Sequence, residues 1–146
     1  MRTDYESMAR IIAEDAHKGQ VRKFNALPYI VHPRTVAATV DVDGLLRNTA
    51  NIIRAIAWLH DVIEDSDYTL DHLRDEGFPE EIIDAVDALT KREDEDYVDY
   101  LQRVSDDMYA TRVKIADIKH NLSDLKKGTL RDKYKLALMI LEKGWL

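Results

Sequence analysis

Hydrophobic residues recur every three or four positions along most of this 146-residue chain, which is the spacing of one face of an α-helix. No alternating run of β-branched residues is long enough to predict a strand. The pattern predicts seven to eight helices, with approximate boundaries at residues 4–18, 33–40, 48–64, 69–77, 79–89, 96–104, 108–125 and 129–143. We therefore expect an all-α fold.

Glycine and proline mark several of these boundaries. Gly19 is expected to end the first helix, and Pro33 is expected at the first position of the second, where its missing N–H costs nothing. Asn48 or Thr49 can cap the third helix with a side-chain oxygen. Residues 20–31 are predicted to be a connection between the first two helices.

The predicted helix at residues 48–64 carries ionisable side chains beside its apolar face. The apolar positions of this helix are Ile52, Ile56, Leu59 and Ile63. His60 and Glu64 are four residues apart, as are Asp61 and Asp65, so each pair is expected on one face. The three carboxylates would repel one another if crowded, and a divalent cation would remove that cost. The alternative is an amphipathic helix whose acidic end faces water.

Two further segments add candidate ligands. His32 precedes Pro33, which restricts its backbone and is expected to hold it just before a helix. On the helix at residues 108–125, Lys114, Asp117 and Asn121 lie to one side of an apolar face. That apolar face is expected to consist of Met108, Ile115, Ile118, Leu122 and Leu125. Each feature alone also fits a plain helix start or a solvated helix surface.

Together these segments supply two imidazoles and two carboxylates as metal-ligand candidates, which are His32, His60, Asp61 and Asp117. Such a nitrogen and oxygen set suits Mn²⁺, Fe²⁺, Co²⁺ or Zn²⁺ better than Ca²⁺. A metal of this kind lowers the pKa of a bound water. Glu64 and Asp65 would then be placed to orient that water or to move a proton. The set predicts hydrolysis of a phosphate ester.

The composition of the chain indicates which partners and which compartment to expect. The net charge of −7 gives no global basic field that would attract a nucleic acid, and no apolar run approaches the ~18 residues that span a bilayer. The chain has no cysteine, which excludes disulfides and cysteine-based zinc sites. We expect a cytoplasmic protein with residues 1–146 as one domain, without nucleic-acid or membrane partners. The sequence leaves the oligomeric state open.

The local strings resemble those of the HD-domain phosphohydrolases, and in particular the alarmone (ppGpp) hydrolases of the RelA/SpoT type and the small stand-alone kind. The similar strings are AHKGQVRK at residues 16–23, PYIVHP at 28–33, LHDVIED at 59–65, LTK at 89–91 and KIAD at 114–117, followed by Asn121. The similarity extends over roughly residues 5–126, which is most of the chain.

This resemblance implies an all-helical HD fold with Mn²⁺ bound by the four candidate ligands, and catalytic roles for Glu64 and Asp65. In these enzymes the reaction removes the 3′-pyrophosphate of ppGpp and yields GDP and pyrophosphate. The substrate-binding residues that follow from it are Arg22 near the guanine nucleoside, Lys23 near a phosphate, Asn121 at the nucleotide, and Lys114 and Tyr29. Tyr29 is expected either to stack on a base or to pack beside His32.

Some strings depart from the family pattern. In the family a Gly-containing turn usually precedes Pro-Tyr-Ile, where this chain has Asn25-Ala26-Leu27. After Ala-Asp the family usually has a basic and then an apolar residue, whereas this chain has Ile118 followed by Lys119. Two alternatives therefore stay open: a phosphohydrolase for another nucleotide or phosphorylated small molecule, and a metal- or nucleotide-binding protein without turnover.

Three histidines and a tryptophan outside the candidate site have plainer expected roles. His17 is expected to be structural. His72 and His120 have no partners at metal-ligand spacing, so surface or packing roles are expected for both. Trp58 is expected in the core.

Overall fold

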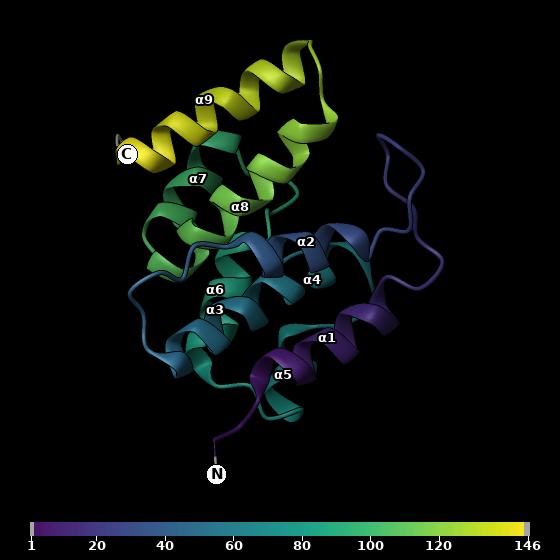
Figure 1. Ribbon diagram of the computed structural model, residues 1–146, viewed down its shortest axis with the longest axis vertical. Coiled ribbons are helices and arrows are strands. Elements are labelled where there is room, and N and C mark those ends of the chain that lie inside the picture. Colours follow the sequence, from purple (N-terminus) through teal and green to yellow (C-terminus); the bar gives the residue numbers. More distant parts are fainter. Residues whose placement is uncertain (1, 145–146) are drawn as a thin grey trace.

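The computed structural model describes residues 2–144, and every regular element in that range is a helix (Figure 1). The nine helices of this range are α1 (Tyr5–Ala16), α2 (Val31–Thr39), α3 (Arg47–Leu59), α4 (Val62–Asp65), α5 (Leu70–Asp75), α6 (Glu80–Leu89), α7 (Tyr97–Ser105), α8 (Met108–Asp124) and α9 (Thr129–Lys143). The expected all-α fold is confirmed, and one predicted helix is divided into α3 and α4.

Helix α3 forms the centre of the core, and α1, α2, α6 and α8 pack around it (Figure 1). The buried residues of α3 are Ala50, Ile53, Ala55, Ile56, Ala57, Trp58 and Leu59. Burial on several sides of one helix requires apolar residues around its circumference rather than on one stripe. Trp58 lies in the core as expected, and its indole Nε1 donates to the Glu6 carboxylate at 3.2 Å.

The prediction of one helix at residues 48–64 is wrong at His60 and Asp61, where α3 ends and α4 begins. The His60 ring explains the break, because its Nδ1 donates to the carbonyl oxygen of Ala57 at 2.6 Å. Within a continuing helix that oxygen would accept the N–H of Asp61. A side chain therefore satisfies a carbonyl that the helix end leaves free. The pairs His60 and Glu64, and Asp61 and Asp65, no longer lie on one straight helix.

Three other sequence expectations need correction. Helix α2 begins at Val31, so His32 lies inside its first turn rather than before it. Leu46 precedes the first residue of α3 without a side-chain cap, so neither Asn48 nor Thr49 caps that helix. Met108, expected on the apolar face of α8, is 63% exposed because it is the first residue of its helix.

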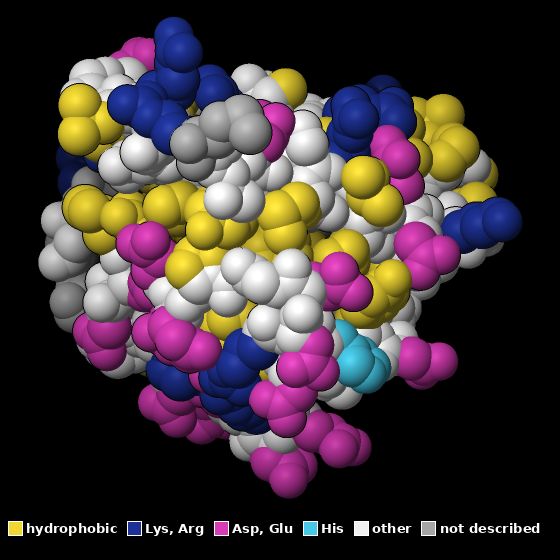
Figure 2. All heavy atoms as spheres, turned by 90° about the horizontal axis from the view of Figure 1, so that it is seen from below, with side chains coloured by type: hydrophobic (Ala, Val, Ile, Leu, Met, Phe, Trp, Pro, Cys, Tyr) yellow, Lys and Arg dark blue, Asp and Glu magenta, His cyan; other side chains and the backbone are white. Residues whose placement is uncertain are grey.

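Helix α9 crosses one end of the molecule and packs on α8 and α7 (Figure 1). The face seen from below shows a belt of hydrophobic side chains with acidic side chains gathered beside it (Figure 2). Among the helices of residues 2–144, none combines the length and the apolar character needed to cross a bilayer.

Candidate active site

A cavity of about 610 Å³ lies where α2, the α3–α4 junction and α8 meet the connection after α1. Its lining residues are Gln20, Val21, Arg22, Lys23, Phe24, Tyr29, His32, Asp61, Glu64, Asp65, Lys114, Asp117, Asn121 and Tyr134. Ten of the eleven residues predicted from the sequence are in this lining, and the eleventh, His60, is buried beside His32 and contacts it. The structure therefore brings together residues that are up to 99 positions apart in the chain.

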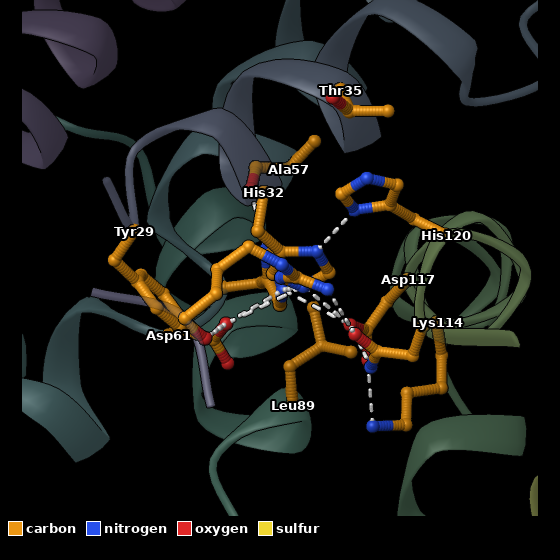
Figure 3. A network of polar contacts seen from close by, with 12 residues as sticks. Tyr29, His32, Thr35, Ala57, Asp61, Leu89, Lys114, Asp117 and His120 are labelled. Atoms are coloured by element: carbon orange, nitrogen blue, oxygen red, sulfur yellow. Dashed lines mark hydrogen bonds and ion pairs between the residues drawn. The ribbon is translucent and has the colours of Figure 1, made fainter. Parts of the chain in front are cut away.

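A buried group of three side chains lies beneath the cavity. His32 Nε2 is 2.7 Å from Asp117 Oδ1, and His60 Nε2 is 3.3 Å from His32 Nε2 and 3.4 Å from Asp117 Oδ1 (Figure 3). The three residues are 1%, 2% and 4% exposed in the order His32, His60, Asp117. Their ligand atoms all lie within 4.8 Å of one another, so this group could hold a metal ion.

Asp61 completes the predicted ligand set from the other side of the two imidazoles. Its Oδ2 lies 3.0 Å from His60 Nε2 and 3.7 Å from His32 Nε2. The same oxygen accepts a hydrogen bond from the Tyr29 hydroxyl at 2.5 Å (Figure 3). Tyr29 also packs edge-on to His32 with ring centres 5.8 Å apart, as the second of its two expected roles requires.

Charge interactions at this group are strong because it is buried. Burial alone would raise the pKa of Asp117, but Lys114 and the hydrogen bonds from the two imidazoles hold it well below its usual range. Burial would lower the pKa of His60, whereas Asp61 and Asp117 raise it well above its usual value. The charged form of Asp117 therefore depends on Lys114 and on the imidazole hydrogen bonds, and a divalent cation at the same place would supply further positive charge.

Glu64 and Asp65 lie at the side of the cavity, on α4. Glu64 accepts the backbone N–H of Lys91 at 2.7 Å, which gives the LTK string a structural role. Burial raises the pKa of Glu64, with the Lys91 amide opposing and Asp61 adding to the shift. Burial and then Asp61 likewise raise the pKa of Asp65. A carboxyl group whose pKa is raised toward neutral is suited to proton transfer.

The opposite wall carries the predicted nucleotide-binding residues. Arg22 is 4% exposed, and its guanidinium donates to Asp124 at 2.7 Å and to Asn121 at 3.2 Å. Asn121 in turn donates to Asp117 at 3.2 Å. Lys23 is exposed at the mouth of the cavity.

Lys114 lies on α8 in the same lining and donates to Asp117 Oδ2 at 2.9 Å. Its ammonium also lies over the ring of Tyr100, 5.1 Å from the ring centre. Burial would lower the pKa of Lys114, but Asp117 outweighs burial and holds it well above the usual value. The lysine is therefore a fixed positive charge at this wall.

Sequence reasoning missed three residues at this site. Asp124 holds Arg22, and Tyr134 of α9 lines the cavity, although neither belongs to a recognised string. His120 was expected in a surface or packing role; it does contact His32, with its Nδ1 2.7 Å from Nδ1 of that ring, a hydrogen-bonding contact that the sequence did not predict (Figure 3). His17 is structural as expected: it is buried, and its Nδ1 is 2.8 Å from the side-chain oxygen of Gln20.

Comparison with known proteins shows what this chain resembles in sequence and in fold. No family model matches the chain. A solved structure of a metazoan orthologue of SpoT, reported to hydrolyse ppGpp, superposes with a TM-score of 0.76 at 20% identity, covering 98% of this chain and 86% of that one. At that identity the match establishes the fold.

Sequence comparison with curated proteins shows a resemblance to enzymes of alarmone metabolism. The chain is 36% identical over 131 residues to guanosine-3′,5′-bis(diphosphate) 3′-pyrophosphohydrolase of Haemophilus influenzae, a match covering 83% of this chain and 18% of that protein. It is 30% identical over 140 residues to GTP pyrophosphokinase of Streptomyces coelicolor, covering 90% of this chain and 16% of that protein. The chain thus spans less than a fifth of the length of these relatives, and its resemblance to alarmone hydrolases is confirmed.

Proposed function

We propose that this chain is a metal-dependent phosphohydrolase that removes the 3′-pyrophosphate of ppGpp or pppGpp and acts in the cytoplasm. The observation that carries the proposal is the buried cluster of His32, His60 and Asp117, with Asp61 beside it, directly beneath a cavity lined by acidic and basic side chains. The names of the relatives support the substrate. We take residues 1–146 as one HD domain.

The four candidate ligands fit a transition metal, and we propose Mn²⁺. They offer two imidazole nitrogens and carboxylate oxygens, a mixed set that Mn²⁺, Fe²⁺, Co²⁺ and Zn²⁺ accept. The burial of His32, His60 and Asp117, beside an Asp61 side chain that is 17% exposed, also fits, because an ion there would neutralise Asp61 and Asp117 without protonated histidines. Bound in this place, the metal would supply Lewis acidity and lower the pKa of a bound water.

Glu64 and Asp65 are proposed to move the protons of the hydrolysis. Water adds its oxygen to the phosphorus next to the ribose 3′-oxygen, and the bond between that phosphorus and the 3′-oxygen breaks. One proton leaves the water and one proton reaches the 3′-oxygen of the GDP product. Because Oε1 of Glu64 accepts the Lys91 amide, the carboxylate is held in a fixed direction with its second oxygen left for this transfer.

The nucleotide is proposed to lie between the metal cluster and the wall that carries Arg22 and Asn121. Lys114, a fixed ammonium, and Lys23, at the mouth, would face the phosphates. Because the guanidinium of Arg22 is held by Asp124, its planar face is fixed before a ligand arrives. Such a fixed plane can stack on a purine.

A second candidate is hydrolysis of another nucleotide, and the connection after α1 favours keeping it. This segment contributes Arg22 and Phe24 to the cavity, yet its Asn25-Ala26-Leu27 turn departs from the pattern of alarmone hydrolases. Ala26 there has φ of 58°, a conformation that usually selects glycine. The connection after α1, which would contribute to recognition of the base, is therefore a part in which this chain differs from the alarmone hydrolases.

The test is to incubate metal-free protein with and without Mn²⁺, offer ppGpp and a panel of ordinary nucleotides, and separate the products by anion exchange. The expected result is Mn²⁺-dependent formation of GDP and pyrophosphate from ppGpp with the other nucleotides intact. Preferential Mn²⁺-dependent cleavage of another nucleotide would show that the proposed substrate is wrong and that the proposed metal-dependent hydrolysis is right. No cleavage of any compound would contradict the proposed hydrolase.

A further inference from the structure

His120 and Asp117 lie one turn apart on α8 and contact opposite edges of the same imidazole. Asp117 Oδ1 is 2.7 Å from Nε2 of His32, and His120 Nδ1 is 2.7 Å from Nδ1 of His32 (Figure 3). Residues three apart on a helix project in nearly the same direction, so one helix can reach both edges of a ring placed across it. His32 is 1% exposed, so its ring orientation depends on these contacts.

The two rings meet edge to edge. Their planes differ by 12° and their centres are 5.0 Å apart, whereas the two Nδ1 atoms are only 2.7 Å apart. If the rings were stacked face to face, nitrogens this close would clash, so the nearly parallel planes are close to a common plane. This is the geometry of a nitrogen-to-nitrogen hydrogen bond, in which one ring donates its proton and the other accepts it.

Which ring donates in this hydrogen bond depends on which nitrogen of His32 must stay free of a proton to bind a metal. His60 shows the pattern, since its Nδ1 donates to the carbonyl oxygen of Ala57 and its Nε2 faces Asp61 and Asp117. A histidine that binds a metal through Nε2 carries its proton on Nδ1 and needs an acceptor there. Among residues 2–144, the acceptor found next to Nδ1 of His32 is His120.

We propose that His120 is a positioning residue that accepts the Nδ1 proton of His32 and so fixes the ring orientation and tautomer in which Nε2 is free to bind the metal. The inference rests on the proposed metal site. In this arrangement the imidazole of His120 carries its own proton on Nε2. Helix α8 then contributes one metal ligand, Asp117, and through His120 also orients a second ligand, His32.

The experiment measures Mn²⁺ affinity directly, by following the signal of free Mn²⁺ in electron paramagnetic resonance during titration of metal-free protein. Three variants change only the acceptor. His120→Leu removes it, His120→Asn keeps an oxygen near the place of Nδ1, and His120→Gln moves that oxygen one bond further out. Lys119→Ala is the matched control, because this neighbour on α8 is exposed and its ammonium pairs with Glu142 at 3.5 Å, away from His32.

We expect His120→Leu and His120→Gln to weaken Mn²⁺ binding by roughly 10–100-fold, which is the usual effect of removing the partner of a metal-binding histidine. His120→Asn and Lys119→Ala should stay within a few-fold of the unmodified protein. If His120→Leu does not fold, the comparison of the Asn and Gln variants decides alone.

Two results would overturn the positioning role. In one, His120→Leu binds Mn²⁺ as tightly as the unmodified protein. In the other, the Asn variant loses as much affinity as the Gln variant, which would mean that the ring packs there without acting as an acceptor. An unmodified protein that binds no Mn²⁺ would instead contradict the metal site itself, so the two failures are distinguishable.

Discussion

The floor and the rim of the cavity are built in different ways. The floor, defined as His32, His60, Asp61 and Asp117, comes from two helices, α2 and α8, and from the α3–α4 junction, and its side chains hold one another through short contacts. The rim, defined as Arg22, Lys23, Phe24 and Tyr134, comes from the connection after α1 and from α9.

This difference assigns separate tasks to the two regions. A rigid and buried set of donors suits a metal and the chemistry common to the family, because its geometry leaves little room for change. A connection with few packing constraints is where substrate recognition can vary without disturbing the core. Changes in the floor should therefore abolish both metal binding and turnover, and changes in the rim should alter substrate binding with the metal retained.

The largest effect is expected from Asp61→Ala in the floor. Removing this carboxylate takes away a proposed ligand and one of the two carboxylates beside the imidazoles, so bound metal and activity should be lost together. Elemental analysis of the dialysed protein and the ppGpp assay measure the two losses. Asp43→Ala, at an exposed position in the connection after α2, is the control and should change neither. If Asp61→Ala keeps one metal per chain, the ligand assignment is wrong.

The next largest effect is expected from Glu64→Gln, which separates metal binding from proton transfer. Glutamine keeps an oxygen for the Lys91 amide but cannot exchange the proton, so metal content should stay and kcat should fall by roughly 10²–10⁴. Glu81→Gln, on the exposed side of α6, is the matched control. An unchanged kcat would exclude Glu64 as a proton carrier.

A smaller effect, confined to substrate binding, is expected from Arg22→Ala in the rim. Loss of a charged group held beside the nucleotide should raise KM for ppGpp by roughly 10–100-fold, since hydrogen bonds of charged groups contribute about 1.5–3 kcal/mol. Metal affinity should remain that of the unmodified protein, because the hydrogen bonds of the Arg22 guanidinium go to Asn121 and Asp124 rather than to a proposed ligand. If Arg22→Ala spares activity on ppGpp, the alarmone-like binding of the nucleotide is contradicted.

The most gradual effect is expected from pH. Burial raises the pKa of Glu64, so its proton is bound over a wider range of acidic pH than in an exposed glutamate. If Glu64 must be unprotonated to take a proton from water, kcat should fall by about tenfold per pH unit once the pH is below that raised pKa. The measurement is a pH profile of kcat at saturating Mn²⁺. In Glu64→Gln this acidic limb should vanish, and a limb that persists would assign it to another group.

The sequence alone predicted which residues form the floor, but not the side-chain contacts that hold these residues in place. Its residues belong to short strings at fixed spacing, such as His60-Asp61 and Glu64-Asp65, so residue type and order are enough to find them. The break between α3 and α4 was missed because apolar residues continue in helical register through Ile63 and no glycine or proline interrupts them. The cause of the break is a side-chain contact, from His60 to Ala57, which periodicity does not register.

The partners of the floor and the rim were missed for a related reason. His120 contacts His32 across 88 positions and Arg22 contacts Asp124 across 102, so no local spacing predicts either contact. Tyr134 reaches the cavity only because α9 folds back over α8, which depends on packing of the whole chain. Local strings therefore predicted which residues gather at the cavity, and tertiary structure was needed to find which residues hold them in place.

The most direct test of the account is a crystal structure of the protein grown with Mn²⁺, with anomalous scattering measured to locate the ion. We expect one strong anomalous peak among His32, His60, Asp61 and Asp117, with Nδ1 of His32 still next to His120. A peak at any other group of side chains, or no peak at the floor at saturating Mn²⁺, would contradict the central claim that these four residues form the metal site.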